Sequence, residues 1–217
     1  MHREVLRQRE LGKDILLIGQ SGHAEVIGTM GQVASGVHLI ATADDVERVA
    51  IADPDKVAWV TQTTLSMDDT APIVAAIMAR FPAATGPKTD DICYASQNRQ
   101  AAVKVMAAEC DLVIVIGSPQ SHNTGRLADV AKAAGVTTRQ VDSAAEVDPA
   151  WLRGVSRVGV TAGASAPPQL VEDVIAALKS HGARAVRELD GVRETVVFPM
   201  PRGMRRAASS FATRPNV

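Results

Sequence analysis

The chain has 217 residues, of which 46% are hydrophobic and 22% charged, a globular composition that suits one large or two small domains. Its formal net charge of -1 gives no electrostatic basis for binding nucleic acid or an anionic membrane surface, so neither partner is expected. No apolar run reaches the roughly 18 residues that span a bilayer, and the charged first residues do not resemble a secretory signal, which predicts a cytoplasmic protein.

The first predicted element is an amphipathic helix over residues 1–11, which Gly12 ends and which leads directly into a strand. In a parallel sheet, a helix in this place usually connects two strands, yet no strand precedes it here. Two interpretations stay open: an ordinary leading helix, or a chain that lacks an upstream unit.

Six short, nearly continuous apolar runs follow, a pattern typical of strands that are buried on both faces of a parallel sheet. The predicted strands are residues 14–19, 37–41, 57–61, 111–117, 136–141 and 157–161. The predicted helices between and after them are residues 70–81, 96–109, 124–134 and 168–181. Either Ser66 or Asp69 can cap the first of these helices. The fold class is therefore α/β.

The two halves of the chain resemble each other. Gly19 ends a strand before a polar loop that reaches His23, and Gly117 ends another strand 98 residues later, before His122. We expect two similar consecutive α/β units, 1–89 and 90–198, each with a small, mainly parallel sheet flanked by helices. Whether duplication or merely common α/β connectivity produced them stays open. The last residues, 199–217, carry four arginines and no acid, which predicts a disordered tail ahead of an anion-binding arm.

Polar loops follow four of the strands, where the carboxyl ends of parallel strands form ligand sites. They offer hydroxyl, amide and imidazole groups beside helix N-termini, which favours the binding of a phosphate-like anion. The alternative is that the hydroxyls only cap helices. Neither a dinucleotide fingerprint nor a nucleotide P-loop is present in the sequence.

Three residues could carry chemistry in these loops. His23 and Glu25 could supply a cation and a proton donor beside an anion, although a glutamate in a first helical turn commonly just favours the helix dipole. Cys93 lies just before a helix, where the dipole favours a thiolate. Cys110, 17 residues on, is expected to be a small core residue, so the residues alone predict reduced thiols and no metal site.

Taken together, five ordered segments closely resemble the motifs of the LytB/IspH family, the 4-hydroxy-3-methylbut-2-enyl diphosphate reductases of the methylerythritol phosphate route to isoprenoids. The segments are GHAEVIGTMGQ (22–32), TQTTLSMDDT (61–70), DDICYASQNRQ (90–100), GSPQSHNTGRL (117–127) and VGVTAGASAP (158–167). This resemblance implies three α/β units around a central 4Fe-4S cluster, of which this sequence matches the second and third.

The resemblance also implies roles for single residues. Glu25 is similar to the acid that delivers protons, Thr63 to the hydroxyl that orients the substrate alcohol, and Cys93 to one of three cluster ligands. The other two ligands have no counterpart in this sequence.

For the substrate diphosphate, the resemblance implies contacts with His23, Ser121, Asn123 and Ser165. His122 stands where the family usually has serine, and it can still donate to phosphate. The diphosphate site is therefore expected to be altered at this position.

The implied reaction removes the hydroxyl of an allylic diphosphate with two electrons from an electron-donor protein and protons through Glu25, giving isopentenyl and dimethylallyl diphosphates. One thiolate cannot normally hold the cluster, so this chain alone is expected to lack a complete one. Two alternatives stay open: a catalytically inactive diphosphate-binding remnant, and one half of a split enzyme whose N-terminal unit is a separate polypeptide.

Overall fold

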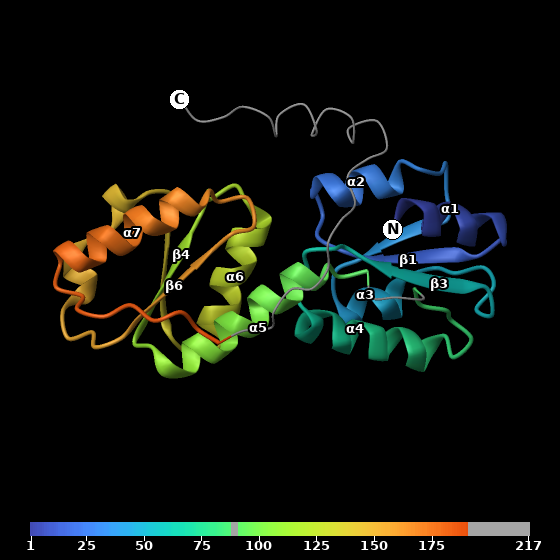
Figure 1. Cartoon of the computed structure of the whole chain (residues 1–217). Helices are drawn as coiled ribbons and strands as arrows, with labels where there is room; N and C mark the ends of the chain where they lie inside the picture. Colours follow the sequence, from blue (N-terminus) through green and yellow to red (C-terminus); the bar gives the residue numbers. More distant parts are fainter. Residues whose placement is uncertain (88–90, 191–217) are drawn as a thin grey trace, which may run out of the picture.

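The computed structural model describes residues 1–87 and 91–190, which form two α/β units side by side (Figure 1). Each unit contains one three-stranded sheet, and every strand pairing in both sheets is parallel. The predicted fold class is thereby confirmed. The predicted boundary at residues 89 and 90, the end of the second unit and the predicted tail 199–217 lie wholly or partly outside the described residues.

The first unit is built on the strand β1, which lies in the middle of its sheet in the order β2-β1-β3. Its strands are β1 (Asp14–Ile18), β2 (Val37–Ile40) and β3 (Val57–Thr61). Its helices are α1 (His2–Glu10), α2 (Ala24–Met30), α3 (Ala43–Arg48) and α4 (Met67–Arg80). Alternate residues of β1 face opposite sides, because Leu16 and Ile18 pack with α3 and α4 whereas Ile15 and Leu17 pack with α1 and α2.

The second unit repeats this arrangement around β4, in the order β5-β4-β6. Its strands are β4 (Leu112–Ile116), β5 (Thr137–Val141) and β6 (Val158–Ala162), and its helices are α5 (Tyr94–Glu109), α6 (His122–Ala133) and α7 (Pro168–Ser180). Two short 3-10 helices, Ala144–Glu146 and Pro149–Leu152, stand where the first unit has α3. Val113 and Val115 pack against α5 and α6, whereas Ile114 packs against α7. The two sheets thus have the same strand order, as the predicted repeat requires.

Three predicted helices begin too late. The sequence placed their starts at residues 70, 96 and 124, whereas the structure starts them at Met67, Tyr94 and His122. The reason is visible at α4 and α6, where the preceding serine accepts a hydrogen bond from the third helical residue: Ser66 Oγ from Asp69 N–H at 3.1 Å, and Ser121 Oγ from Thr124 N–H at 3.3 Å. Polar residues expected in loops are therefore helix caps and first-turn residues, which fixes their backbones.

Among the helices of residues 1–87 and 91–190, none combines the length and the apolar character that a membrane-spanning segment requires.

Candidate functional site

His23 forms the N-cap of α2, in the loop that follows β1. Its Nδ1 accepts a hydrogen bond from the backbone N–H of Glu25 at 3.1 Å. Because Nδ1 uses its lone pair in this bond, the neutral imidazole carries its proton on Nε2. The cap therefore turns His23 into a hydrogen-bond donor whose Nε2–H can reach a ligand.

The Glu25 carboxylate joins the first unit's two ligand-side loops. It accepts hydrogen bonds from Thr63 Oγ–H at 3.0 Å and from Thr63 N–H at 3.2 Å. Thr63 lies in the loop between β3 and α4. This loop is close to the start of α2 because the carboxyl ends of β1 and β3 meet at one edge of the parallel sheet. The acid and the hydroxyl that the sequence resemblance pairs are thus in direct contact.

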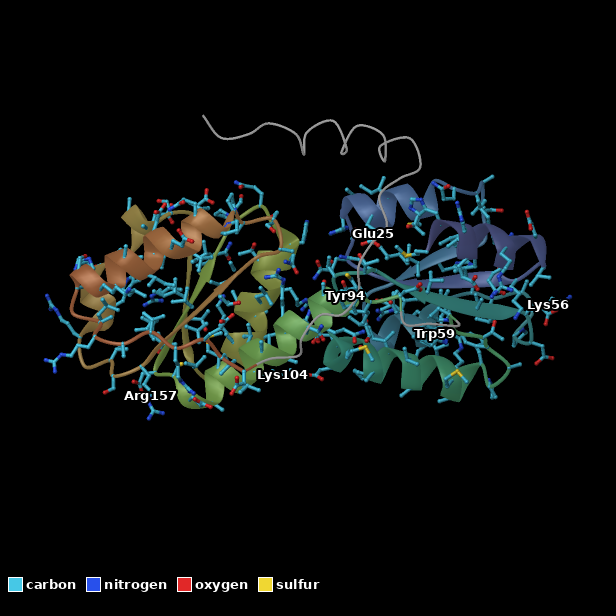
Figure 2. All side chains as sticks on the ribbon, in the orientation of Figure 1. Glu25, Lys56, Trp59, Tyr94, Lys104 and Arg157 are labelled. Carbon is cyan, nitrogen blue, oxygen red and sulfur yellow. The ribbon has the colours of Figure 1, made fainter. Side chains whose placement is uncertain are left out.

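Cys93 is connected to the same loop. Its backbone N–H donates to the carbonyl oxygen of Thr63 at 3.0 Å, and its side chain is exposed. Cys93 is the N-cap residue of α5 and makes no side-chain capping bond. Figure 2 shows Glu25 and Tyr94, the residue after Cys93, near the junction of the two units. The backbone of Cys93 is therefore tied to the loop that carries Thr63, and its exposed thiol makes no capping bond.

The second unit brings His122 against His23. The two ring centroids are 4.3 Å apart and the rings meet edge to face, with an interplanar angle of 61°. His122 is exposed and is the first residue of α6. Burial lowers the pKa of His23 below its ordinary value of 6.5, and the neighbouring His122 lowers it further, whereas Glu25 raises it.

Asn123 follows in the first turn of α6. Its side-chain Nδ2 is buried and has no hydrogen-bond partner among the described residues. A buried amide donor without an acceptor is uncommon, because it loses its bonds to water. An anion at the N-terminus of α6 would satisfy it, with the help of the helix dipole.

The loop after β6 lies against the same turn. Gly163 is so close to Thr124 that a Cβ atom at this position would stand 2.2 Å from Thr124 Oγ1. Ser165, two residues on, is exposed. The loop thus approaches the first turn of α6, while Ser165 itself faces solvent.

The structure therefore gathers most of the predicted site residues at the junction of the two units. His23, Glu25 and Thr63 come from the first unit, Ser121, His122 and Asn123 from the start of α6, and Cys93 from the start of α5. Their roles stay predictions. The alternative that such residues cap helices applies to Ser121 and His23, which both accept capping bonds in this structure.

The described residues do not fit a complete iron-sulfur cluster. Within 1–87 and 91–190, no three His, Cys, Asp or Glu side chains gather in a way that could hold a metal ion. Cys93 and Cys110 flank the 16-residue helix α5 at its two ends, so the helix separates them by about 26 Å at 1.5 Å per residue. Cys110 is only partly buried, at the edge of a core cluster, and this burial raises the pKa of its thiol. One exposed thiol, Cys93, is what this part of the chain offers, whereas such clusters are held by several.

Sequence reasoning missed two residues that hold the site together. Gln62, which is 1% exposed, accepts from Gln20 N–H at 3.0 Å and donates to Thr64 Oγ1 at 2.9 Å, so that it joins the loops after β1 and β3. The Asp91 carboxylate accepts from Thr61 N–H at 3.1 Å, and burial raises its pKa. The sequence does show that Gln62 directly follows β3 and that Asp91 precedes Cys93 by two residues. It does not show whether such polar side chains bind another loop or a ligand.

The contact between the two imidazoles predicts a measurable effect. We expect His122→Ser to raise the pKa of His23 toward 6.5, because the change removes both a neighbouring positive charge and part of the burial. Titration of the imidazole signals by NMR measures this value, and His181→Ser, at the exposed end of α7, is the matched control. An unchanged His23 titration in His122→Ser would contradict the described contact.

Comparison with known proteins gives a consistent result. The sequence profile of the family described as "LytB protein" matches residues 1–179. The chain is 53% identical over 210 residues to "4-hydroxy-3-methylbut-2-enyl diphosphate reductase 2" of Burkholderia mallei, which covers 97% of this chain and 64% of that protein. It is 56% identical over 207 residues to the reductase of the same name from Azoarcus sp., covering 95% of this chain and 66% of that one.

One solved structure resembles this chain over nearly the whole length of this chain. The E-1-hydroxy-2-methyl-but-2-enyl-4-diphosphate reductase of Plasmodium falciparum superposes with a TM-score of 0.89 at 30% identity, covering 98% of this chain and 67% of that chain. The chain thus spans about two thirds of the length of the proteins that it resembles.

Proposed function

The chain belongs to the LytB family, and from this premise we propose that it forms the diphosphate-binding and proton-delivering part of a 4-hydroxy-3-methylbut-2-enyl diphosphate reductase. The observation that carries the proposal is a continuous series of contacts at the junction of the units. It runs from the His23–His122 pair through Glu25 and Thr63 to the backbone of Cys93. Such a series supports a site in which an anion, an acid and the Cys93 segment lie near one another.

In this proposal the diphosphate lies at the N-termini of α2 and α6. The Nε2–H of His23 and the unpartnered amide of Asn123 donate to its oxygens, and His122 adds a second imidazole. Ser121 and Ser165 add hydroxyl donors. The hydroxyl proton of Ser121 is available for this, because its Oγ acts only as an acceptor in the capping bond. The substrate hydroxyl then extends toward the loop that carries Thr63.

Glu25 and Thr63 perform the proton chemistry. In the structure Thr63 Oγ–H donates to Glu25, at 3.0 Å. When Glu25 is protonated this bond reverses: Glu25 donates its proton to Thr63 Oγ, and Thr63 Oγ–H donates to the substrate oxygen. Reductive removal of the hydroxyl consumes two electrons and two protons: the C–O bond breaks, the oxygen leaves as water, and the allylic carbons take up the remaining proton. Glu25 supplies protons in this scheme and Thr63 orients the oxygen that leaves.

The electrons require a group that the described residues do not hold. We propose that Cys93 contributes one thiolate to a 4Fe-4S cluster, that the other thiolates and the first α/β unit come from sequence outside this chain, and that an electron-donor protein reduces the assembled enzyme. The support is the share of the relatives that the chain spans, 64% for the Burkholderia mallei reductase.

Calorimetric titration of this chain with inorganic pyrophosphate tests the anion-binding part of the proposal. We expect saturable binding at one site per chain, and much weaker binding of sulfate, because sulfate cannot bridge the His23 and Asn123 donors as two linked phosphates can. No saturable heat with pyrophosphate, or an equal response to sulfate, would contradict the proposed site.

A second candidate, a catalytically inactive diphosphate-binding module, is favoured by the single exposed thiol and by His122 in the first turn of α6. Both candidates bind pyrophosphate. Co-expression with a separate family N-terminal unit distinguishes them, because restored turnover of the allylic diphosphate supports the reductase and excludes the inactive module.

A further inference from the structure

We propose that Arg126 is a positioning residue, whose ion pair with Asp69 of the first unit holds the first turn of α6, and with it His122, against His23. This inference rests on the proposed function, because it concerns how the two halves of the proposed diphosphate site are kept together. Neither the motif resemblance nor the contacts at the site itself assign Arg126 a role.

The position of Arg126 on α6 suits this task. It follows His122 by four residues, so the two side chains share one face of the helix about 6 Å apart along its axis. A contact made by Arg126 therefore controls both the rotation of α6 and its distance from the opposing unit. Any tilt of the first turn that breaks this contact also moves His122.

The partner of Arg126 is Asp69, at the start of α4 in the first unit. Arg126 Nη1 is 2.8 Å from Asp69 Oδ2, and the arginine side chain is only 17% exposed. Asp69 stands in the first turn of α4, and its N–H donates to the cap residue Ser66 at 3.1 Å. The loop just before this cap carries Thr63. One ion pair thus links α6, one turn after His122, to the helix that follows the Glu25–Thr63 pair.

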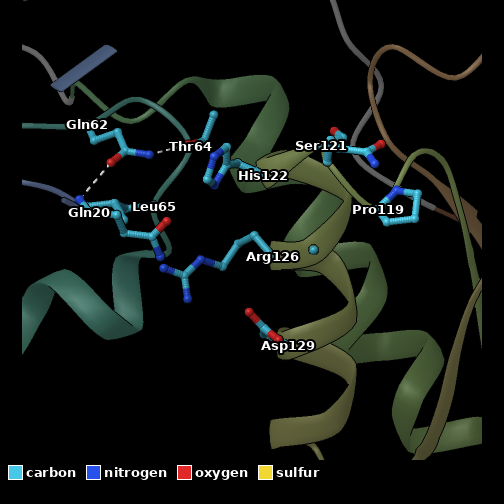
Figure 3. A pocket seen from close by; sticks show the side chains of 11 residues that line it. Gln20, Gln62, Thr64, Leu65, Pro119, Ser121, His122, Arg126 and Asp129 are labelled. Atoms are coloured by element: carbon cyan, nitrogen blue, oxygen red, sulfur yellow. Dashed lines mark hydrogen bonds between the residues drawn. The ribbon is translucent and has the colours of Figure 1, made fainter. Parts of the chain in front are cut away.

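A cavity beneath α6 explains why an ion pair is needed at this point. The cavity has a volume of about 300 Å³ and lies between α6 and the loops after β1 and β3. Figure 3 shows the Arg126 side chain extending from α6 toward Gln20, with Asp129 one turn further along the helix. The opposite face of α6 packs into the core of its own unit. On the side that faces the first unit side chains do not fill the space, so close packing leaves room there for the charged Arg126 side chain to set the position of α6.

Two further polar contacts between the units involve α5 rather than α6. Gln100 of α5 donates to the Leu65 carbonyl at 3.3 Å, and Lys104 of α5 pairs with Asp68. Lys104 lies on the exposed surface (Figure 2), and both members of its pair are far more exposed than Arg126. Within residues 1–87 and 91–190, Arg126–Asp69 is the ion pair that connects α6 itself to the first unit.

The competing interpretation is that Arg126 binds the anion directly. The two roles differ in what Asp69 does. If Arg126 is a ligand, Asp69 competes with the anion for it, and Asp69→Asn strengthens binding. If Arg126 is a positioning residue, Asp69→Asn weakens binding just as Arg126→Gln does, although the two changes alter the net charge in opposite directions.

The experiment measures pyrophosphate affinity by calorimetry and the titration of the anion-free His23 imidazole by NMR, in the full chain and in Arg126→Gln, Asp69→Asn and Arg126→Lys. We expect the first two variants to weaken pyrophosphate binding about fivefold and to raise the pKa of His23, because His122 moves away and exposes it. Arg126→Lys keeps the charge and should restore part of both properties. Lys104→Gln, which removes a cation from the same junction but not from α6, is the control and should leave the His23 titration unchanged.

Tighter binding in Asp69→Asn would overturn the proposal, and so would a His23 titration that Arg126→Gln and Asp69→Asn leave unchanged. An equal shift in Lys104→Gln would also overturn it, since the effect would then not belong to α6. If Arg126→Gln fails to fold, Asp69→Asn and Arg126→Lys still show whether loss of the ion pair weakens or strengthens pyrophosphate binding. Absence of pyrophosphate binding by the unaltered chain would instead refute the proposed function, while the His23 titrations continue to test the positioning role.

Discussion

In an active assembly that contains this chain, Glu25→Gln is expected to lower turnover of the allylic diphosphate by roughly 10² to 10⁴-fold while KM changes little. The amide has the shape of the carboxylate and its oxygen can still accept the hydrogen bonds from Thr63. It cannot, however, carry a transferable proton. The loss therefore falls on the proton-transfer step rather than on binding, and steady-state rates at saturating and at limiting substrate separate the two.

The matched control for this change is Glu10→Gln, which removes the same charge from the exposed end of α1. Turnover in the control should equal that of the unaltered assembly. If Glu25→Gln also turns over at the unaltered rate, Glu25 does not deliver the proton, and its contact with Thr63 serves only to join two loops.

The second large effect concerns His23. We expect His23→Ala to weaken pyrophosphate binding by roughly 10- to 100-fold, the usual cost of losing a hydrogen bond to a charged group. The removed group is the imidazole whose Nδ1 caps α2 and whose Nε2–H is free to donate. Calorimetry with the full chain measures the affinity, and His181→Ala at the end of α7 is the control that removes an exposed imidazole elsewhere.

His23→Ala also removes a helix cap, so a second variant is needed. Serine at this position keeps a capping oxygen for α2 but has no imidazole. We expect His23→Ser to bind pyrophosphate as weakly as His23→Ala. If His23→Ser instead binds like the unaltered chain, the histidine acts as a cap alone, and the anion is held by other groups.

Much of the fold could be predicted from the sequence because its strands are short, apolar and buried on both faces. Residues 15–18 of β1 and all five residues of β4 are buried and pack with helices on both sides of their sheets, so their apolar runs are unbroken. The helix starts were less predictable. Ser66 was one of two candidate caps and Ser121 was expected in a loop, and only their capping bonds show that each directly precedes a helix.

The site was predictable only in part, for a physical reason. The convergence of Glu25 and Thr63 follows from the parallel sheet, since β1 and β3 end at the same edge. The contact between His23 and His122 does not, because it depends on how one unit sits against the other. The contacts of Gln62 and Arg126 were missed for the same reason, since their partners lie in other loops or in the other unit.

The most direct test of the central claim is to follow the backbone and side-chain amide signals of the full chain by NMR while inorganic pyrophosphate is added. A diphosphate site at the junction of the units predicts that the largest changes fall on His23, Glu25 and Thr63 in the first unit and on His122 and the Asn123 side-chain amide in the second. Changes confined to one unit, or centred away from the starts of α2 and α6, would contradict it.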